Sequence, residues 1–89
     1  MAKRTLDIIN EKGLHARASA KFVECVEDFD ADALVMRDDV DAPGDSIMGL
    51  LMLAASKGTQ ITVETSGPQA DELADALQAL VSSRFGEEY

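Results

Sequence analysis

The pattern of hydrophobic and polar positions along the chain changes period several times. Leu6 and Ile8 alternate with polar neighbours, a period of two that predicts a strand over residues 3–9. After Gly13 the period becomes helical, with Phe22 and Val26 four residues apart, and predicts a helix over 16–28. The first third of the chain is therefore expected to form a strand, a turn and a helix.

The rest of the chain continues to alternate strands with helices. Two short strands are predicted over 31–37 and 40–42, with a turn at Asp38-Asp39 between them, and a fourth over 60–65. A helix with Ser46 as N-cap is predicted through Leu53, and a third after Ser66-Gly67-Pro68-Gln69, which has the S-x-x-Q form of a capping box. Gly86 is expected to stop this last helix, leaving Glu87-Glu88-Tyr89 as a trailing acidic tail.

The order of these elements, βαββαβα, indicates the fold class. Amphipathic helices and half-polar strands each have one apolar side to bury. The simplest arrangement is an α+β two-layer open-faced sandwich, in which three helices cover one face of a four-stranded antiparallel sheet. With 89 residues, the chain is expected to be one domain over 1–89.

The second helix is apolar on all sides. Its apolar residues are Ile47, Met48, Leu50, Leu51, Met52 and Leu53. A one-sided apolar stripe takes about half of the positions of a helix, so part of this set is expected to be exposed. An exposed apolar surface of this kind suits docking onto another protein.

Charge and composition exclude several classes of function. The net charge of −9 disfavours nucleic acid and anionic membranes, and residues 1–21, with five bases and two acids, form the one basic part of the chain. No apolar run is long enough for a membrane span or a signal core, which favours a cytoplasmic protein. The single cysteine, Cys25, and the single histidine leave no metal site, and no structural zinc is expected.

The segment Gly13-Leu14-His15-Ala16-Arg17 carries the strongest chemical signal. His15 falls at the expected N-cap, where the first amide groups of a helix lack backbone partners, and Arg17 adds a permanent positive charge. Such a site can hold an anion, and a neutral imidazole is a nucleophile near pH 7. The alternative from position alone is that His15 only caps the helix and Arg17 is a solvated surface residue.

The motif Gly13-Leu14-His15-Ala16-Arg17-Ala18 resembles the phosphohistidine motif of the HPr family, the phosphocarriers of the bacterial phosphotransferase system. The resemblance extends over nearly the whole chain and implies the fold given above. It implies that His15 carries a phosphoryl group from enzyme I to enzyme IIA and that Arg17 and the amides of Ala16, Arg17 and Ala18 stabilise it. It implies no metal and no cofactor, and a monomer is expected.

Two details refine the resemblance. Leu50-Leu51-Met52-Leu53, Ser56-Lys57-Gly58 and Ser66-Gly67-Pro68-Gln69 look closer to the nitrogen-related branch, NPr, than to the sugar-transport branch. Ala18 stands where family members commonly have proline, which adds a backbone N–H and removes some rigidity.

The resemblance also implies a regulatory site and a docking surface. Ser46 matches the serine that a dedicated kinase, the HPr kinase/phosphorylase, phosphorylates in many relatives, although a helix cap alone would also explain a serine there. The expected docking residues for enzyme I and enzyme IIA are Leu14, Arg17, Lys21, Ile47, Met48 and Leu51.

Two other functions compete with this hypothesis. Asp45-Ser46-Ile47 resembles the Asp-Ser-Leu motif of acyl carrier proteins, in which the serine bears phosphopantetheine. Those proteins are all-helical with an acidic helix after the serine, whereas residues 47–55 contain no acid and the chain shows strand patterns. The second alternative is a regulatory HPr-like module that carries no phosphate, but such modules lack the histidine that is present here.

Overall fold

The computed structural model describes residues 1–89 and has the predicted α+β architecture in the predicted order. The elements are β1 (Ala2–Asp7), α1 (Ala16–Glu27), β2 (Asp32–Arg37), β3 (Val40–Pro43), α2 (Ile47–Met52), β4 (Gln60–Ser66), α3 (Ala70–Ser82) and a 3₁₀ turn, η1 (Arg84–Gly86). No helix has the length and apolar character needed to cross a membrane.

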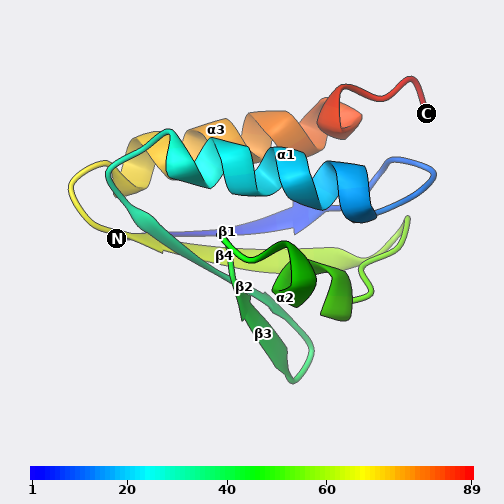
Figure 1. The fold of residues 1–89 in the computed structure, drawn as a ribbon, viewed down its shortest axis with the longest axis horizontal. Coiled ribbons are helices and arrows are strands. Elements are labelled where there is room, and N and C mark those ends of the chain that lie inside the picture. The colour runs from blue at the N-terminus through cyan, green and yellow to red at the C-terminus, as the bar shows by residue number, and fades with distance from the viewer.

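The four strands form one antiparallel sheet in the order β1-β4-β2-β3. The ends of the β1–β4 pairing are Ala2 opposite Thr65 and Asp7 opposite Gln60. The helices α1 and α3 lie side by side over one face of this sheet, and α2 packs near the β2–β3 hairpin (Figure 1). The termini of the chain lie at opposite ends of the molecule (Figure 1).

The core lies between the helices and the covered face of the sheet. Alternate strand residues are buried there because successive side chains of a strand point to opposite faces. The largest buried side chains of the core are Ile8, Phe22, Val35, Leu50, Leu53, Ile61, Val63, Leu73, Leu77, Val81 and Phe85. Phe85 belongs to this core although it follows the last α-helix, so the C-terminal segment is tied to the fold.

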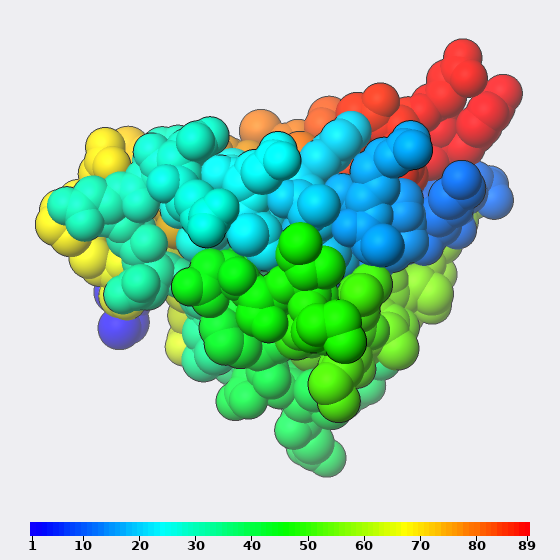
Figure 2. All heavy atoms as spheres, viewed as in Figure 1, coloured from blue at the N-terminus to red at the C-terminus, as the bar shows by residue number.

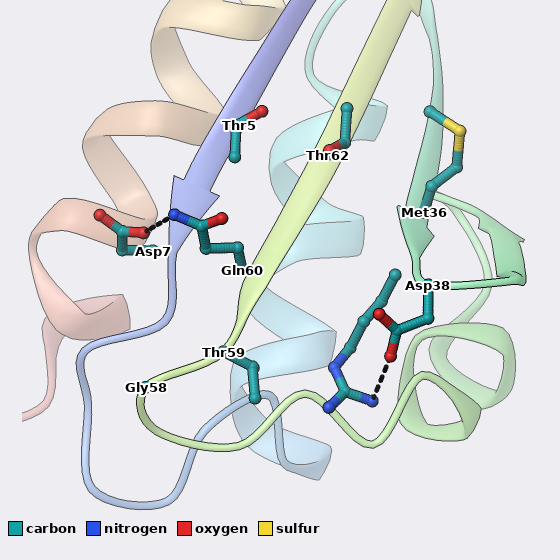
Figure 3. Close-up of a pocket in the computed structure, with 9 residues that line it drawn as sticks. Thr5, Asp7, Met36, Asp38, Gly58, Thr59, Gln60 and Thr62 are labelled. Carbon is teal, nitrogen blue, oxygen red and sulfur yellow. Dashed lines mark hydrogen bonds and ion pairs between the residues drawn. The ribbon is translucent and has the colours of Figure 1, made fainter.

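The other face of the sheet is uncovered and polar. An open depression of about 490 Å³ lies on it, and Figure 3 shows side chains of β1, β2 and β4 and of the loop before β4 around it. Its charged groups are partly paired: Gln60 Nε2 donates to Asp7 Oδ1 at 2.8 Å, and Arg37 Nη1 lies 3.8 Å from Asp38 Oδ2.

Two local predictions for α3 are wrong. Ser66 does not cap the helix, because β4 continues through Ser66 and α3 begins at Ala70. The Gln69 side chain makes no cap either, since its Oε1 accepts a hydrogen bond from the Asp30 amide at 2.7 Å. At its other end α3 stops at Ser82, four residues before Gly86, and the chain turns instead through η1.

Candidate phosphoryl-transfer site

The loop before α1 is fixed by a close approach to the segment that follows α2. Gly13 has a φ of +64°, and a Cβ at this position would stand 2.5 Å from the carbonyl oxygen of Ala55. The next amide, of Leu14, donates to that same oxygen at 2.8 Å. Only glycine allows this contact, which sets where α1 begins.

His15 is the N-cap residue of α1, with extended backbone angles. Its side chain caps no amide, and the first hydrogen bond of the helix runs from the Ser19 amide to the His15 carbonyl at 2.8 Å. The amides of Ala16, Arg17 and Ala18 therefore precede the first helical hydrogen bond. The part of the alternative in which the His15 ring caps the helix is therefore wrong, whereas Arg17 is exposed to solvent, as that alternative has it.

The His15 ring contacts a residue from the other end of the chain. Glu87 Oε2 pairs with His15 Nε2, while Glu87 Oε1 accepts a hydrogen bond from Asn10 Nδ2 at 2.9 Å. The C-terminal residues and the loop before α1 lie against one another (Figure 2). The prediction of a free acidic tail is wrong for Glu87, because a buried Phe85 holds the tail beside the site.

The surroundings of Glu87 lower the pKa of its carboxyl below the ordinary value. Desolvation by burial alone would raise it, but the hydrogen bonds from Asn10 and His15 outweigh that effect, together with the charges of His15 and Lys12. The carboxyl is thus held as a carboxylate, the form in which it can only accept hydrogen bonds.

The lowered pKa of Glu87 predicts a pH dependence of stability. A carboxyl whose pKa is lower in the folded state stabilises the protein above its unfolded value of about 4.5, and this contribution is lost as the pH falls below it. The free energy of unfolding of wild type should exceed that of Glu87→Gln at pH 6, and the difference should shrink below pH ~4.5. Urea denaturation of both proteins between pH 3 and 7 measures this, and a difference independent of pH would contradict it.

An open depression of about 580 Å³ adjoins the His15 ring. Its lining combines the bases Lys12 and Arg17 with acidic residues of the loop and the tail. Arg17 is exposed and forms no ion pair, so its guanidinium is free to bind an anion beside His15.

Two of the expected docking residues are placed differently from the prediction. Leu14 is only 4% exposed and belongs to the core, because its backbone is tied to Ala55, so its side chain offers no docking surface. Lys21 is half-buried, and its Nζ donates to the carbonyl oxygen of Phe85 at 2.6 Å. Lys21 therefore anchors the tail instead of standing free for a partner.

The apolar residues of α2 are partly buried and partly exposed, as predicted. Leu50 and Leu53 are buried, Leu51 is half-buried, and Ile47, Met48 and Met52 are exposed, the two methionines by 70% and 75%. Ser46 is the N-cap, and its Oγ accepts a hydrogen bond from the Gly49 amide at 3.1 Å. The exposed surface of α2 lies next to α1, which carries Arg17 (Figures 1 and 2).

The chain matches a known family over most of its length. Residues 2–83 match the family model described as the phosphorylation site of the HPr component of the phosphotransferase system. The chain belongs to the HPr family. It is 47% identical to the phosphocarrier protein HPr of Neisseria meningitidis, over 98% of both chains. A crystal structure of HPr from Thermoanaerobacter tengcongensis superimposes with a TM-score of 0.95 at 36% identity, covering 100% of each chain.

Membership of the HPr family establishes the chain as a phosphocarrier of the phosphotransferase system. The four-stranded sheet excludes the all-helical acyl carrier alternative. The phosphocarrier protein NPr of Escherichia coli is 42% identical over 97% of both chains, below the 47% of the HPr relative, so identity does not favour the nitrogen-related branch.

Two residues of the site escaped the sequence-based prediction. Glu87 pairs with His15, and Asn10 donates a hydrogen bond to Glu87, both from outside α1. Glu87 lies 72 positions from His15, and no local pattern connects the two. The one available signal was Phe85, a large apolar residue in a segment otherwise polar, which indicated that the tail returns to the core.

Proposed function

We propose that His15 is the residue that carries the phosphoryl group, accepting it from enzyme I and passing it to enzyme IIA in the cytoplasm. The observation that carries the proposal is the position of the ring: it is 26% exposed at the start of α1 and is not used as a cap. A neutral imidazole there can attack a phosphohistidine of a partner, and the product keeps a labile P–N bond that permits onward transfer.

The start of α1 supplies the groups that stabilise the phosphoryl oxygens. The amides of Ala16, Arg17 and Ala18 have no helical acceptor and lie at the positive end of the helix dipole. Alanine at position 18 leaves one more N–H available than proline would. The Arg17 guanidinium adds a charge-assisted donor on the exposed side of the helix.

Phosphorylation by enzyme I tests the proposal. The protein is incubated with enzyme I and phosphoenolpyruvate, and the modified residue is mapped by mass spectrometry under alkaline conditions that preserve phosphohistidine. We expect one acid-labile phosphoryl group on His15. An acid-stable phosphate on a serine, with none on His15, would contradict the proposal.

Replacing Arg17 by alanine should slow transfer without unfolding the protein. Arg17 is exposed and forms no ion pair, so its loss leaves the core intact. Removing one charge-assisted contact to the phosphoryl group in transit should lower the transfer rate by about 10- to 1000-fold. Rapid-quench kinetics measures this rate, with Lys3→Ala as a control that removes an exposed positive charge on β1. Unchanged kinetics in Arg17→Ala would remove Arg17 from the site.

The surface that meets enzyme I and enzyme IIA is proposed to combine Arg17 with the apolar surface of α2. Ile47, Met48 and Met52 are exposed there, and Leu51 is half-buried. Methionine side chains adapt to different partners, which suits a carrier that must bind a donor and an acceptor in turn. Met52 joins this surface in place of the buried Leu14.

Ser46 is proposed as a regulatory phosphorylation site for an HPr kinase/phosphorylase. Its hydroxyl lies at the start of α2, immediately before the exposed Ile47 and Met48. The helix N-terminus tolerates a new negative charge, whereas an apolar docking surface beside it does not. A serine phosphoester is stable, so it can act as a signal without competing with the carrier step.

Ser46→Asp should reduce the rate at which enzyme I phosphorylates His15. The carboxylate keeps a capping acceptor but introduces a charge next to the docking surface, and we expect about a tenfold loss in apparent affinity. Ser46→Ala is the control, since it loses ~1 kcal/mol of cap energy without adding charge. A rate for Ser46→Asp equal to that of wild type would show that Ser46 is only a helix cap.

The nitrogen-related branch stays a prediction from three segments of the sequence: Leu50-Leu51-Met52-Leu53, Ser56-Lys57-Gly58 and Ser66-Gly67-Pro68-Gln69. Of these residues, Met52 is 75% exposed on the proposed docking surface. Comparing phosphoryl transfer to an enzyme IIA of the nitrogen-related system and one of the sugar system decides the branch. Faster transfer to the sugar-system acceptor would contradict the prediction.

A further inference from the structure

The C-terminal segment is built to hold one carboxylate beside the site. Arg84 and Phe85 have φ values of 57° and 55°, in the left-handed region that costs non-glycine residues about 1–2 kcal/mol each. Gly86 continues the turn with a φ of 76°. Burial of the Phe85 side chain in the core offsets this strain. The hydrogen bond from Lys21 Nζ to the Phe85 carbonyl oxygen holds the backbone of the same residue.

Beyond this turn, the two oxygens of Glu87 have separate partners. Asn10 is fully buried, and its Nδ2 donates to Glu87 Oε1 at 2.9 Å and to the Gly13 carbonyl oxygen at 2.8 Å. With both amide hydrogens of Asn10 used, Glu87 Oε1 is held in place and Oε2 reaches His15 Nε2. The Glu87 side chain is only 18% exposed, so the carboxylate is a fixed part of the site.

We propose that Glu87 is the positioning residue for His15 in phosphoryl transfer, an inference that rests on the proposed role of His15 as the carrier. A carboxylate only accepts hydrogen bonds, so His15 Nε2 must hold the proton in this contact. In the neutral ring Nδ1 then has the free lone pair. The contact fixes the plane of the ring and makes Nδ1 the nucleophile.

The phosphoryl step needs no proton transfer in this arrangement. His15 Nδ1 forms a bond to phosphorus while the bond between phosphorus and the donor's histidine nitrogen breaks, and that nitrogen keeps the electron pair. The Nε2 proton stays on His15, so the phosphorylated ring is positively charged. The Glu87 carboxylate faces that charge and stabilises it as it develops. In onward transfer the same events run in reverse.

If Glu87 had a purely structural role, anchoring the C-terminal segment, a different result would be expected. Phe85 and Lys21 already anchor the tail without Glu87. Replacement of a residue that only anchors this segment would change the stability of the protein and leave the rate of phosphoryl transfer unchanged. Glu88 offers a matched control, because it is an exposed carboxylate next in sequence that lines the same depression and forms no hydrogen bond to His15.

The test compares Glu87→Ala, Glu87→Gln and Glu88→Gln with wild type in two measurements. The first is the NMR signal of the proton on His15 Nε2, recorded without any partner. In wild type and Glu88→Gln we expect a downfield proton on Nε2 that exchanges slowly with solvent. Glu87→Ala should lose this signal, and Glu87→Gln should retain a weaker one because its amide oxygen can still accept.

The second measurement is the rate of His15 phosphorylation by enzyme I at varied concentrations of the carrier. Glu87→Ala should lower kcat by tenfold or more, on the order of the loss when the partner that orients a histidine is removed, with KM within about twofold of wild type. Glu87→Gln should recover part of kcat, and Glu88→Gln should equal wild type.

Several outcomes would overturn the inference. These are an unchanged kcat in Glu87→Ala, a change confined to KM, an equal loss in Glu88→Gln, or a wild-type Nε2 without a bound proton. Failure of the proposed function itself is distinct, since wild type would then take no phosphoryl group on His15 at all.

Discussion

His15→Ala should accept no phosphoryl group from enzyme I and should still fold. The imidazole is the only histidine ring of the chain, and the Ser19 hydroxyl in the first turn of α1 is buried and donates to the Leu14 carbonyl oxygen. Because the ring is partly exposed and caps no amide, its removal costs only the contact with Glu87, about 1–2 kcal/mol of stability. Incorporation of phosphate should fall below detection, while the circular dichroism spectrum stays that of wild type.

Two controls make the loss in His15→Ala interpretable. Thermal unfolding should remain cooperative, which shows that the site was removed and the fold kept. His15→Ala should also retain the chemical shifts of the exposed α2 residues Met48 and Met52, since these lie on another helix. A His15→Ala protein that still takes acid-labile phosphate would mean that another residue is the carrier.

Gly13→Ala should produce the second large effect, through the backbone. The new methyl group would stand 2.5 Å from the Ala55 carbonyl oxygen and 2.8 Å from the Ser56 Cα, in a residue whose φ of +64° already strains an L-amino acid. Strain and overpacking together should cost about 2–4 kcal/mol. The loop must shift away from Ala55, and because His15 follows two residues later, phosphoryl transfer should slow as well.

Gly58→Ala is the matched control for Gly13→Ala. Gly58 also has a positive φ, +90°, but a Cβ there meets nothing within 4 Å. It should carry the backbone strain without the collision, cost about 1 kcal/mol, and leave the transfer rate unchanged. Urea denaturation and rapid-quench kinetics on both variants separate the two effects. Equal losses of stability in the two variants would show that the contact with Ala55 is unimportant.

The elements that depend on local pattern could be predicted from the sequence. Alternation around Leu6 and Ile61 gives strands, and the helical spacing of Phe22 and Val26 gives α1. His15 was placed correctly at the N-cap because Gly13 ends the preceding pattern. The sequence also predicted that only part of the apolar residues of α2 would be buried, because a short helix cannot bury every side.

The features that depend on distant contacts could not be predicted. Leu14 lies next to the exposed site in sequence, yet its amide bonds to Ala55 and its side chain enters the core. The Gln69 side chain has the right spacing for a capping box. Its Oε1 instead accepts a hydrogen bond from the backbone amide of Asp30, which is distant in sequence. The contact of Glu87 with His15 depends on three consecutive left-handed residues, two of which are not glycine. No local propensity favours such a turn.

The carrier role is tested most directly by following the phosphoryl group after it has been accepted. Protein phosphorylated on His15 is freed of enzyme I and phosphoenolpyruvate and mixed with enzyme IIA, and the phosphate on each protein is measured by mass spectrometry over time. We expect the phosphate to leave His15 and to appear on the acceptor in equal amount, faster than it is lost in a sample without enzyme IIA. Phosphate that stays on the protein, or is released only to water at the same rate with and without enzyme IIA of either branch, would contradict the account.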